Sequence, residues 1–147
     1  MLATKRDRKQ LAGHFNHYGK ELAKKRAECY TGHNFTALAK ENDSIVGVLQ
    51  WYIKEDPNAG VAELEELYVL EKYRNKGIAS SLTCYAIQSI RDYFKDNGIR
   101  PRKIFAFVSK NNPASRRTNE KNGFKLISEV GDLFAENKTE LFYVLDL

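Results

Sequence analysis

The order of strand and helix patterns along the chain predicts an α/β (α+β) fold, with a mixed, mostly antiparallel central sheet and helices packed on it. Three strand-like segments follow one another with short polar turns between them, which is typical of an antiparallel meander. The remainder alternates helical and strand periodicity, and no linker, repeat or low-complexity tract interrupts it. We therefore expect a single domain over residues 1–147.

The N-terminal segment is predicted to be helical. Apolar side chains recur at helical spacing between Arg6 and Tyr30, and Gly13 and Gly19 allow either one long helix or two short ones. The first ten residues give little strand signal, so a first strand should be short or missing. The three histidines are interpreted as surface residues: His14, His17 and His33.

The meander is predicted over residues 35–41, 44–53 and 61–70. Simple alternation along its third strand separates the side chains into two sets. Glu63, Glu65, Leu67 and Val69 should face one side, and Leu64, Glu66, Tyr68 and Leu70 the other. Trp51, Tyr52 and Phe107 are interpreted as packed strand residues rather than as an aromatic substrate cage.

The second half is predicted to hold two helices and three strands. A helix over 77–95 is followed by a buried strand over 103–109, and Asn112 with Pro113 should cap a second helix that ends at 122–123. Two strands, 124–130 and 139–147, then close the chain.

The charge distribution argues against a nucleic-acid partner. The net charge is +5, and the first thirty residues hold eight Lys or Arg against three acids, whereas the rest is balanced. A solvated basic helix accounts for this excess. The aromatic residues that a nucleic-acid surface interleaves with its basic residues do not accompany it. The cations that would bind nucleic acid under the alternative hypothesis are Lys5, Arg6, Arg8, Lys9, Lys24, Lys25 and Arg26.

Composition also bears on compartment and cofactors. No apolar run approaches the length of a membrane span, and no secretory signal is recognisable, so we expect a cytoplasmic protein without a membrane partner. Cys29 and Cys84 have no spacing that predicts a disulfide or a zinc site, and we expect reduced thiols and no metal. The oligomeric state stays open, with a homodimer as one alternative.

The segment RNKGIA lies between a predicted strand and a predicted helix, where backbone N–H groups point outwards without helical partners. Gly77 lets an anion approach the backbone, Ala79 keeps the next turn slim, and Arg74 and Lys76 add positive charge. This pattern predicts a pyrophosphate site.

The chain resembles the GCN5-related N-acetyltransferase (GNAT) family in two ordered motifs. LEELYVLEKYRNKGIASSL is similar to the family's acetyl-coenzyme A (acetyl-CoA) motif, and NNPASRRTNEKNGF is similar to a second motif downstream. The resemblance covers residues 34–147 and implies six to seven strands, helices on both faces, and a splayed central strand pair with a β-bulge near Leu67–Val69. It also implies transfer of an acetyl group to a primary amine by direct attack in a ternary complex.

The resemblance assigns the acetyl-CoA contacts residue by residue. Leu67, Tyr68 and Val69 would hold the acetyl and pantetheine parts, and Asn112 and Ser115 would line the pantetheine arm. The pyrophosphate would be held by Arg74, Asn75, Lys76, Gly77, Ile78 and Ala79.

A base is needed because an alkyl amine is protonated near neutral pH. Glu63 matches the position at which the histone-acetylating branch keeps its base, and Glu65 with Glu66 resembles the acidic pair of polyamine-acetylating members. Either Glu63 or Glu65 is the candidate, acting through an ordered water or with a raised pKa.

One position departs from the family pattern. Asn119 stands where many members have a Tyr that protonates the leaving thiolate. The thiolate would then leave unprotonated, or another hydroxyl such as that of Ser115 would hydrogen-bond it. A CoA-binding regulatory module without turnover is therefore an alternative to the enzyme.

The acceptor also stays open between two classes. The acidic pair on the third strand favours a small amine or polyamine. The second motif favours a protein N-terminus or lysine, because four of its residues are similar to the branch that acetylates protein N-termini: Ser115, Arg117, Glu120 and Lys121.

Overall fold

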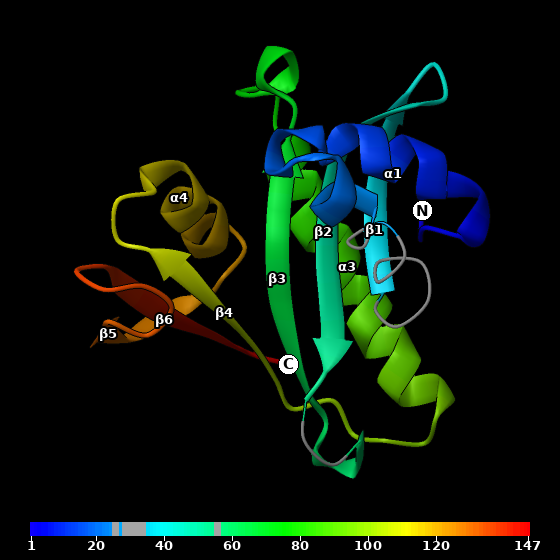
Figure 1. Ribbon diagram of the computed structural model, residues 1–147. Helices are drawn as coiled ribbons and strands as arrows, with labels where there is room; N and C mark the ends of the chain where they lie inside the picture. Colours follow the sequence, from blue (N-terminus) through cyan, green and yellow to red (C-terminus); the bar gives the residue numbers. More distant parts are fainter. Residues whose placement is uncertain (25–26, 28–34, 55–56) are drawn as a thin grey trace.

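Six strands form one mixed sheet in the order β1-β2-β3-β4-β6-β5 (Figure 1). The computed structural model describes residues 1–24, 27, 35–54 and 57–147. The strands are β1 (Phe35–Glu41), β2 (Ser44–Ile53), β3 (Val61–Val69), β4 (Lys103–Ser109), β5 (Lys125–Gly131) and β6 (Thr139–Asp146). The α-helices whose bounds lie within the described residues are α1 (Arg8–His14), α3 (Ile78–Asp96) and α4 (Pro113–Lys121). The predicted fold class is confirmed.

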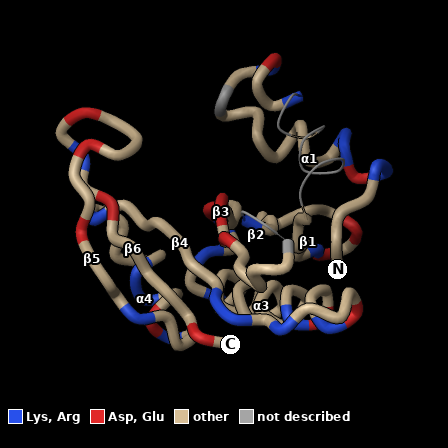
Figure 2. Tube along the Cα trace, turned by 90° about the horizontal axis from the view of Figure 1, so that it is seen from below, with Lys and Arg blue, Asp and Glu red and all other residues tan. Residues whose placement is uncertain are grey.

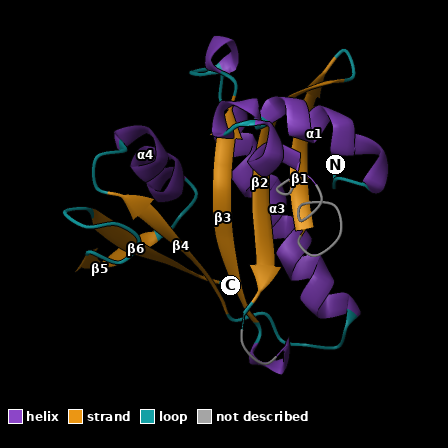
Figure 3. Ribbon diagram, in the orientation of Figure 1, coloured by secondary structure: helices purple, strands orange, loops and turns teal. Residues whose placement is uncertain are grey.

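Helices cover both faces of the sheet, as expected. Figure 2 shows α3 and α4 on one side and α1 on the other, and Figure 3 shows the same layers by element type. The apolar stripe of α3, which includes Leu82, Ala86, Ile90 and Phe94, is buried against the sheet in the larger core. A smaller core lies under α1, with Leu11 and Phe15 fully buried.

The two central strands separate partway along their length. β3 and β4 are parallel and pair from Val61 with Lys103 to Leu64 with Ala106, whereas every other neighbouring pair of strands is antiparallel. Beyond Leu64 the strands diverge (Figure 1), so the following part of β3 has no strand partner on its β4 side. The expected splayed pair is present.

A β-bulge in β3 corrects the predicted alternation. Leu49 pairs with Leu67 and Trp51 pairs with Leu64, so two residues, Glu65 and Glu66, stand opposite one residue of β2. The extra residue shifts the phase, and Leu67 and Val69 join Leu64 in the core under α3. Their predicted placement on the face of Glu63 is therefore wrong. The bulge lies just before the expected Leu67–Val69 segment.

The N-terminal segment is broken, in agreement with the two-helix alternative. A 3-10 turn (Lys5–Asp7) precedes α1, a second 3-10 turn (Asn16–Tyr18) follows it, and residues 20–24 are again helical. Gly19 has a φ of 89°, which ends the second turn. The predicted helix end near Tyr30 lies outside the described residues.

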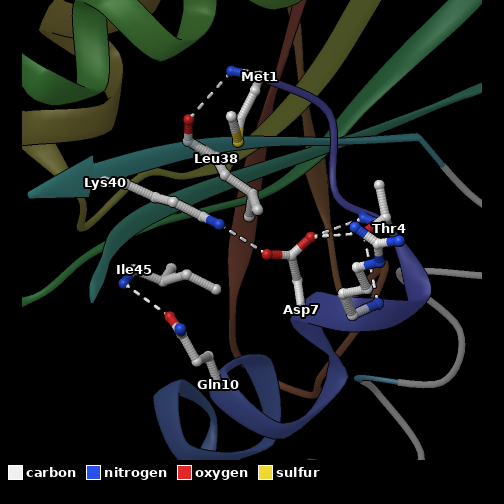
Figure 4. Close-up of polar contacts among 8 residues, drawn as sticks. Met1, Thr4, Asp7, Gln10, Leu38, Lys40 and Ile45 are labelled. Atoms are coloured by element: carbon white, nitrogen blue, oxygen red, sulfur yellow. Dashed lines mark hydrogen bonds and ion pairs between the residues drawn. The ribbon is translucent and has the colours of Figure 1, made fainter. Parts of the chain in front are cut away.

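Polar contacts tie this segment to the sheet (Figure 4). The Asp7 carboxylate accepts hydrogen bonds from the Thr4 backbone N–H at 2.8 Å and from Lys40 Nζ of β1 at 2.7 Å. Gln10 Oε1 accepts from the Ile45 N–H of β2 at 3.2 Å. A single bridge between Leu2 and Ala37 supplies the short first strand that the sequence left open.

Candidate active site

A cavity of about 590 Å³ lies beside the loop that joins β3 to α3. Its walls come from the end of β3, the start of α3 and one face of α4. Every predicted acetyl-CoA contact except Lys76 lines it: Leu67, Tyr68, Val69, Arg74, Asn75, Gly77, Ile78, Ala79, Asn112 and Ser115. Six further residues, which the sequence motifs do not assign to this site, also line the cavity: Tyr73, Ser80, Ala114, Arg117, Thr118 and Lys121.

The loop before α3 exposes backbone donors to this cavity. Gly77 caps the helix with a φ of 81°, a left-handed conformation that glycine adopts without strain. The Ser81 N–H donates to the Gly77 carbonyl at 3.0 Å, so the N–H groups of the three preceding helical residues have no acceptor within the helix. Such a helix start attracts anions.

The positive charge of the site differs from the prediction. Arg74 Nε donates to the Val69 carbonyl at 3.0 Å, which holds this side chain against the end of β3. Lys76 does not line the cavity, and its Nζ lies 5.3 Å from the centroid of the Tyr73 ring. Arg117 and Lys121, four residues apart on α4, bring two further cations to the cavity. Their spacing of four residues, which places both on one face of a helix, was the signal in the sequence that could have assigned them to the site.

A second cavity of about 330 Å³ lies in the split between β3 and β4. It shares Leu67, Asn112 and Ser115 with the first cavity, so the two meet at these residues. Asn112 also caps α4, since its side-chain oxygen accepts from the Ser115 N–H at 3.1 Å. The second cavity contains all three acids of β3, Glu63, Glu65 and Glu66.

Glu63 is a paired carboxylate. It is 7% exposed, accepts a hydrogen bond from the Tyr52 hydroxyl at 2.8 Å, and forms an ion pair with Lys54 at 2.8 Å. The Glu63 carboxylate raises the pKa of Lys54 to about 12, and burial together with Glu63 raises the pKa of Tyr52 to about 12. The pair therefore persists at neutral pH.

Glu65 has a different environment. Glu65 as a whole residue is exposed, although its carboxyl group is partly buried. Among the described residues, no Lys or Arg lies within ion-pair distance of it. Partial burial and the negative charges of Glu63 and Glu66 raise the pKa of Glu65, although a hydrogen bond from Gln50 works against this. A carboxyl with a raised pKa is better matched to accepting a proton near neutral pH.

Asn119 is buried at the wall of the second cavity. It is 5% exposed, and its Nδ2 has no hydrogen-bond partner. The hydroxyl-bearing residues lining this cavity are Thr83, Ser109 and Ser115. Thr83 donates its hydroxyl hydrogen to the Ala79 carbonyl at 2.9 Å. An unpaired buried amide is costly in a folded protein, so it marks a position where a ligand can complete the hydrogen bonding.

Two interpretations of ring residues are corrected. His14 is 8% exposed and lies edge-on to the Tyr68 ring at 5.0 Å, so it is a buried residue at the end of α1 and not a surface residue. Trp51 is in the core as expected, but Tyr52 binds Glu63 and Phe107 lines the second cavity. The apolar spacing of α1 does place His14 three residues after Leu11, which was the missed signal.

Across residues 1–24, 27, 35–54 and 57–147, no three His, Cys, Asp or Glu side chains gather as a metal site. In the same ranges, no helix combines the length and apolar character needed to cross a bilayer.

The chain belongs to the Acetyltransferase (GNAT) family, whose profile matches residues 5–124. A search of the curated proteins finds no match. Solved structures share the fold at low sequence identity. The candidate acetyltransferase yncA of Salmonella typhimurium, solved with its cofactor acetyl-CoA, is 18% identical with a TM-score of 0.80, and the match covers 100% of this chain and 92% of that one.

Two further structures are of enzymes that are named for their acetyl acceptors. A ribosomal-protein-alanine N-acetyltransferase from Brucella melitensis is 18% identical with a TM-score of 0.77, and the match covers 100% and 99% of the two chains. An aminoglycoside 6′-N-acetyltransferase complexed with coenzyme A is 14% identical with a TM-score of 0.72, covering 99% and 96%. These likenesses show the fold.

Proposed function

We propose that the protein transfers the acetyl group of acetyl-CoA to a primary amine by direct attack in a ternary complex. The observation that carries this proposal is the meeting of the two cavities at Leu67, Asn112 and Ser115. One cavity has a helix start and cations suited to a pyrophosphate, and the other has carboxylates suited to an ammonium group. The acetyl-CoA bound to the Salmonella typhimurium structure is consistent with this assignment.

The proposed binding roles follow from the cavity walls. The backbone from Gly77 to Ala79 binds the pyrophosphate, with Arg117 and Lys121 adding charge. The unpaired side of β3 after the bulge supplies N–H groups to the pantetheine arm and to the thioester carbonyl. Asn112 and Ser115 line the point where the reacting groups meet.

Glu65 is the proposed base, and Glu63 is the supporting residue. The ammonium group gives its proton to Glu65, directly or through one water. The nitrogen lone pair then attacks the thioester carbon and a C–N bond forms. The C–S bond breaks to release the thiolate of CoA, and the nitrogen loses its second proton to solvent, which leaves the neutral amide. Glu63 is less suited to this step because Lys54 and Tyr52 already hold its carboxylate.

Asn119 is the proposed partner of the departing thiolate. Its unpaired Nδ2 can donate a hydrogen bond to the sulfur without transferring a proton. Ser115 is a second donor within the same cavity.

Calorimetric titration with acetyl-CoA, followed by a thiol-release assay with a panel of amines, tests the proposal. We expect binding, and release of free CoA that depends on the amine. Absence of binding at millimolar acetyl-CoA would contradict the proposed function. Binding without release for any amine would instead support the alternative of a CoA-binding regulatory module, which the Asn at position 119 favours.

The panel also separates the two acceptor classes. Polyamines and small amines represent the first class, and peptides with free N-termini or lysines represent the second. The Brucella melitensis and aminoglycoside enzymes act on different kinds of acceptor, so the shared fold leaves both classes open.

A further inference from the structure

The second cavity has two walls of opposite character. On β3, Glu65 lacks a cationic partner among the described residues, since Lys54 is held by Glu63 at 2.8 Å. Across the split, β4 presents Ala106, Phe107 and Val108. Phe134 of the loop between β5 and β6 completes this apolar side.

Ring contacts hold the two aromatic side chains in place. Phe107 stacks on Phe142 of β6 with ring centroids 5.0 Å apart, and Phe134 meets Phe107 edge-on at 5.7 Å. The base of the loop is closed by hydrogen bonds from the Asp132 N–H to the Lys138 carbonyl at 2.8 Å and from the Asn137 N–H to Asp132 Oδ1 at 2.6 Å. Phe134 is therefore presented on a fixed turn.

Phe134 is nevertheless 68% exposed. The folded chain gains little from burying this side chain, so its apolar surface at the rim of a cavity is available to a ligand. Ligand pockets typically combine such an apolar lining with a few polar groups that fix orientation.

We infer that the acceptor is a primary amine that carries an apolar, ring-sized group close to its nitrogen. This inference rests on the proposed function and names the substrate class of the same site. The ammonium group lies against Glu65, and the apolar group lies against Phe107 and Phe134, which both line the cavity. Phe134 is a specificity-determining residue.

The same walls disfavour a polyamine. A polyamine carries a second ammonium group a few bonds from the first, and a chain that extends from Glu65 across the split would place that charge against the apolar side chains of the β4 wall. The cavity volume of about 330 Å³ accommodates one ring on a short chain, which is also the size of an apolar side chain on a peptide N-terminus.

The test compares three amines in the acetyl-CoA-dependent thiol-release assay. 3-Phenylpropylamine and propylamine differ by the ring and have amino groups of nearly equal basicity, and spermidine represents the polyamines. With the unmodified protein we expect kcat/KM for 3-phenylpropylamine to exceed that for propylamine by about tenfold or more. Equal values for these two amines, or a preference for spermidine, would overturn the inference.

The variant Phe134→Ser, with Leu133→Ser as its matched control, shows whether the preference for the ring-bearing amine depends on Phe134. Leu133 is the neighbouring exposed apolar residue, 42% exposed, and it does not line the cavity. We expect Phe134→Ser to reduce the preference for the ring-bearing amine threefold to tenfold, through a higher KM, and Leu133→Ser to leave it unchanged. An equal loss in both variants would overturn the assignment of Phe134.

Failure of this inference differs from failure of the proposed function. Acetylation of propylamine and 3-phenylpropylamine at equal kcat/KM removes only the specificity. Absence of acetyl-CoA binding in calorimetry removes the proposed function and this inference with it. Thermal unfolding of each variant shows whether the fold is retained.

Discussion

Glu63 and Glu65 are the same residue type two positions apart on β3, yet their neighbours give them different chemistry. Lys54 and Tyr52 hold the Glu63 carboxylate. The Glu65 carboxyl has a raised pKa because it is partly buried and stands among other acids. The sequence named both as candidate bases, and side-chain contacts alone separate them.

The Glu65→Gln variant is expected to lower kcat/KM at pH 7 by a factor of about 10² to 10⁴, the usual contribution of a positioned base. Activity of the unmodified protein should fall as the pH drops through the raised pKa of Glu65, because the protonated carboxyl cannot accept a proton. This acidic limb should be missing from the variant's pH profile.

Glu41→Gln is the control, since Glu41 is an exposed residue at the end of β1. It should leave both the rate and the pH profile unchanged. A Glu65→Gln rate within twofold of the unmodified protein at every pH would exclude Glu65 as the base.

Asn119→Leu should change stability and activity in opposite directions. Replacing an unpaired buried amide by an apolar side chain of similar size is expected to raise the free energy of unfolding by about 1 kcal/mol. It should also lower kcat about tenfold, because the thiolate loses a hydrogen-bond donor. Urea unfolding and thiol-release kinetics measure the two quantities, and an unchanged kcat would remove Asn119 from the mechanism.

At the scale of elements, strands β1 to β6 and helices α3 and α4 were predicted to within one or two residues because their side-chain patterns are local. The helix expected over 77–95 is Ile78–Asp96, and the second helix begins at Pro113 with Asn112 as its cap. The alternation of apolar and polar side chains along β3 could not predict the position of the bulge, because the bulge depends on the register between β3 and β2. It changes which side chains of β3 share a face.

Gly77→Ala tests the loop that precedes α3. An added Cβ would meet no atom within 4 Å, so the penalty comes from the φ of 81°. We expect a loss of about 1 kcal/mol in the free energy of unfolding and about tenfold weaker acetyl-CoA binding in calorimetry, because the loop's N–H groups shift.

Gly13→Ala provides the matched control for this substitution. Gly13 lies within α1, where an added Cβ also meets no atom within 4 Å and alanine favours the helix. This variant should be as stable as the unmodified protein or more stable. Equal effects of the two substitutions would contradict the role given to the Gly77 conformation.

At the scale of the whole molecule, two cores on opposite faces of the sheet share the strands that form the site. The larger core contains Leu64 and Val69 of β3, and the smaller one packs α1 against the same strand through His14 and Tyr68. Burial lowers the pKa of His14 from 6.5 to about 4, with His17 adding to the shift and Glu66 and the Ile45 backbone opposing it.

This lowered pKa makes stability depend on pH. Unfolded His14 binds a proton below about pH 6.5 and folded His14 only near pH 4, so the unfolded state takes up more protons between these values. The stability is present above pH 6.5 and is lost as the pH falls towards 4. Allowing for partial solvent screening, we expect the loss to be about 1 to 2 kcal/mol.

His14→Phe keeps an aromatic ring in this position and removes the titration. Urea unfolding of both proteins at pH 7.5 and pH 5 should show a smaller difference between the two pH values for the variant. Parallel losses in the two proteins would show that other groups cause the pH dependence.

The sequence by itself determined the order of elements and the two motifs, and the family resemblance of these motifs assigned ten of the sixteen residues around the larger cavity. These features follow from local side-chain spacing, helix caps and the conformational freedom of glycine. The tertiary structure decided which acid is paired, that Asn119 Nδ2 is buried without a hydrogen-bond partner, and that α4 cations line the same cavity as the loop before α3. It also brought Phe134 to the cavity between β3 and β4, because contacts between residues distant in sequence depend on strand register and packing, which no local pattern records.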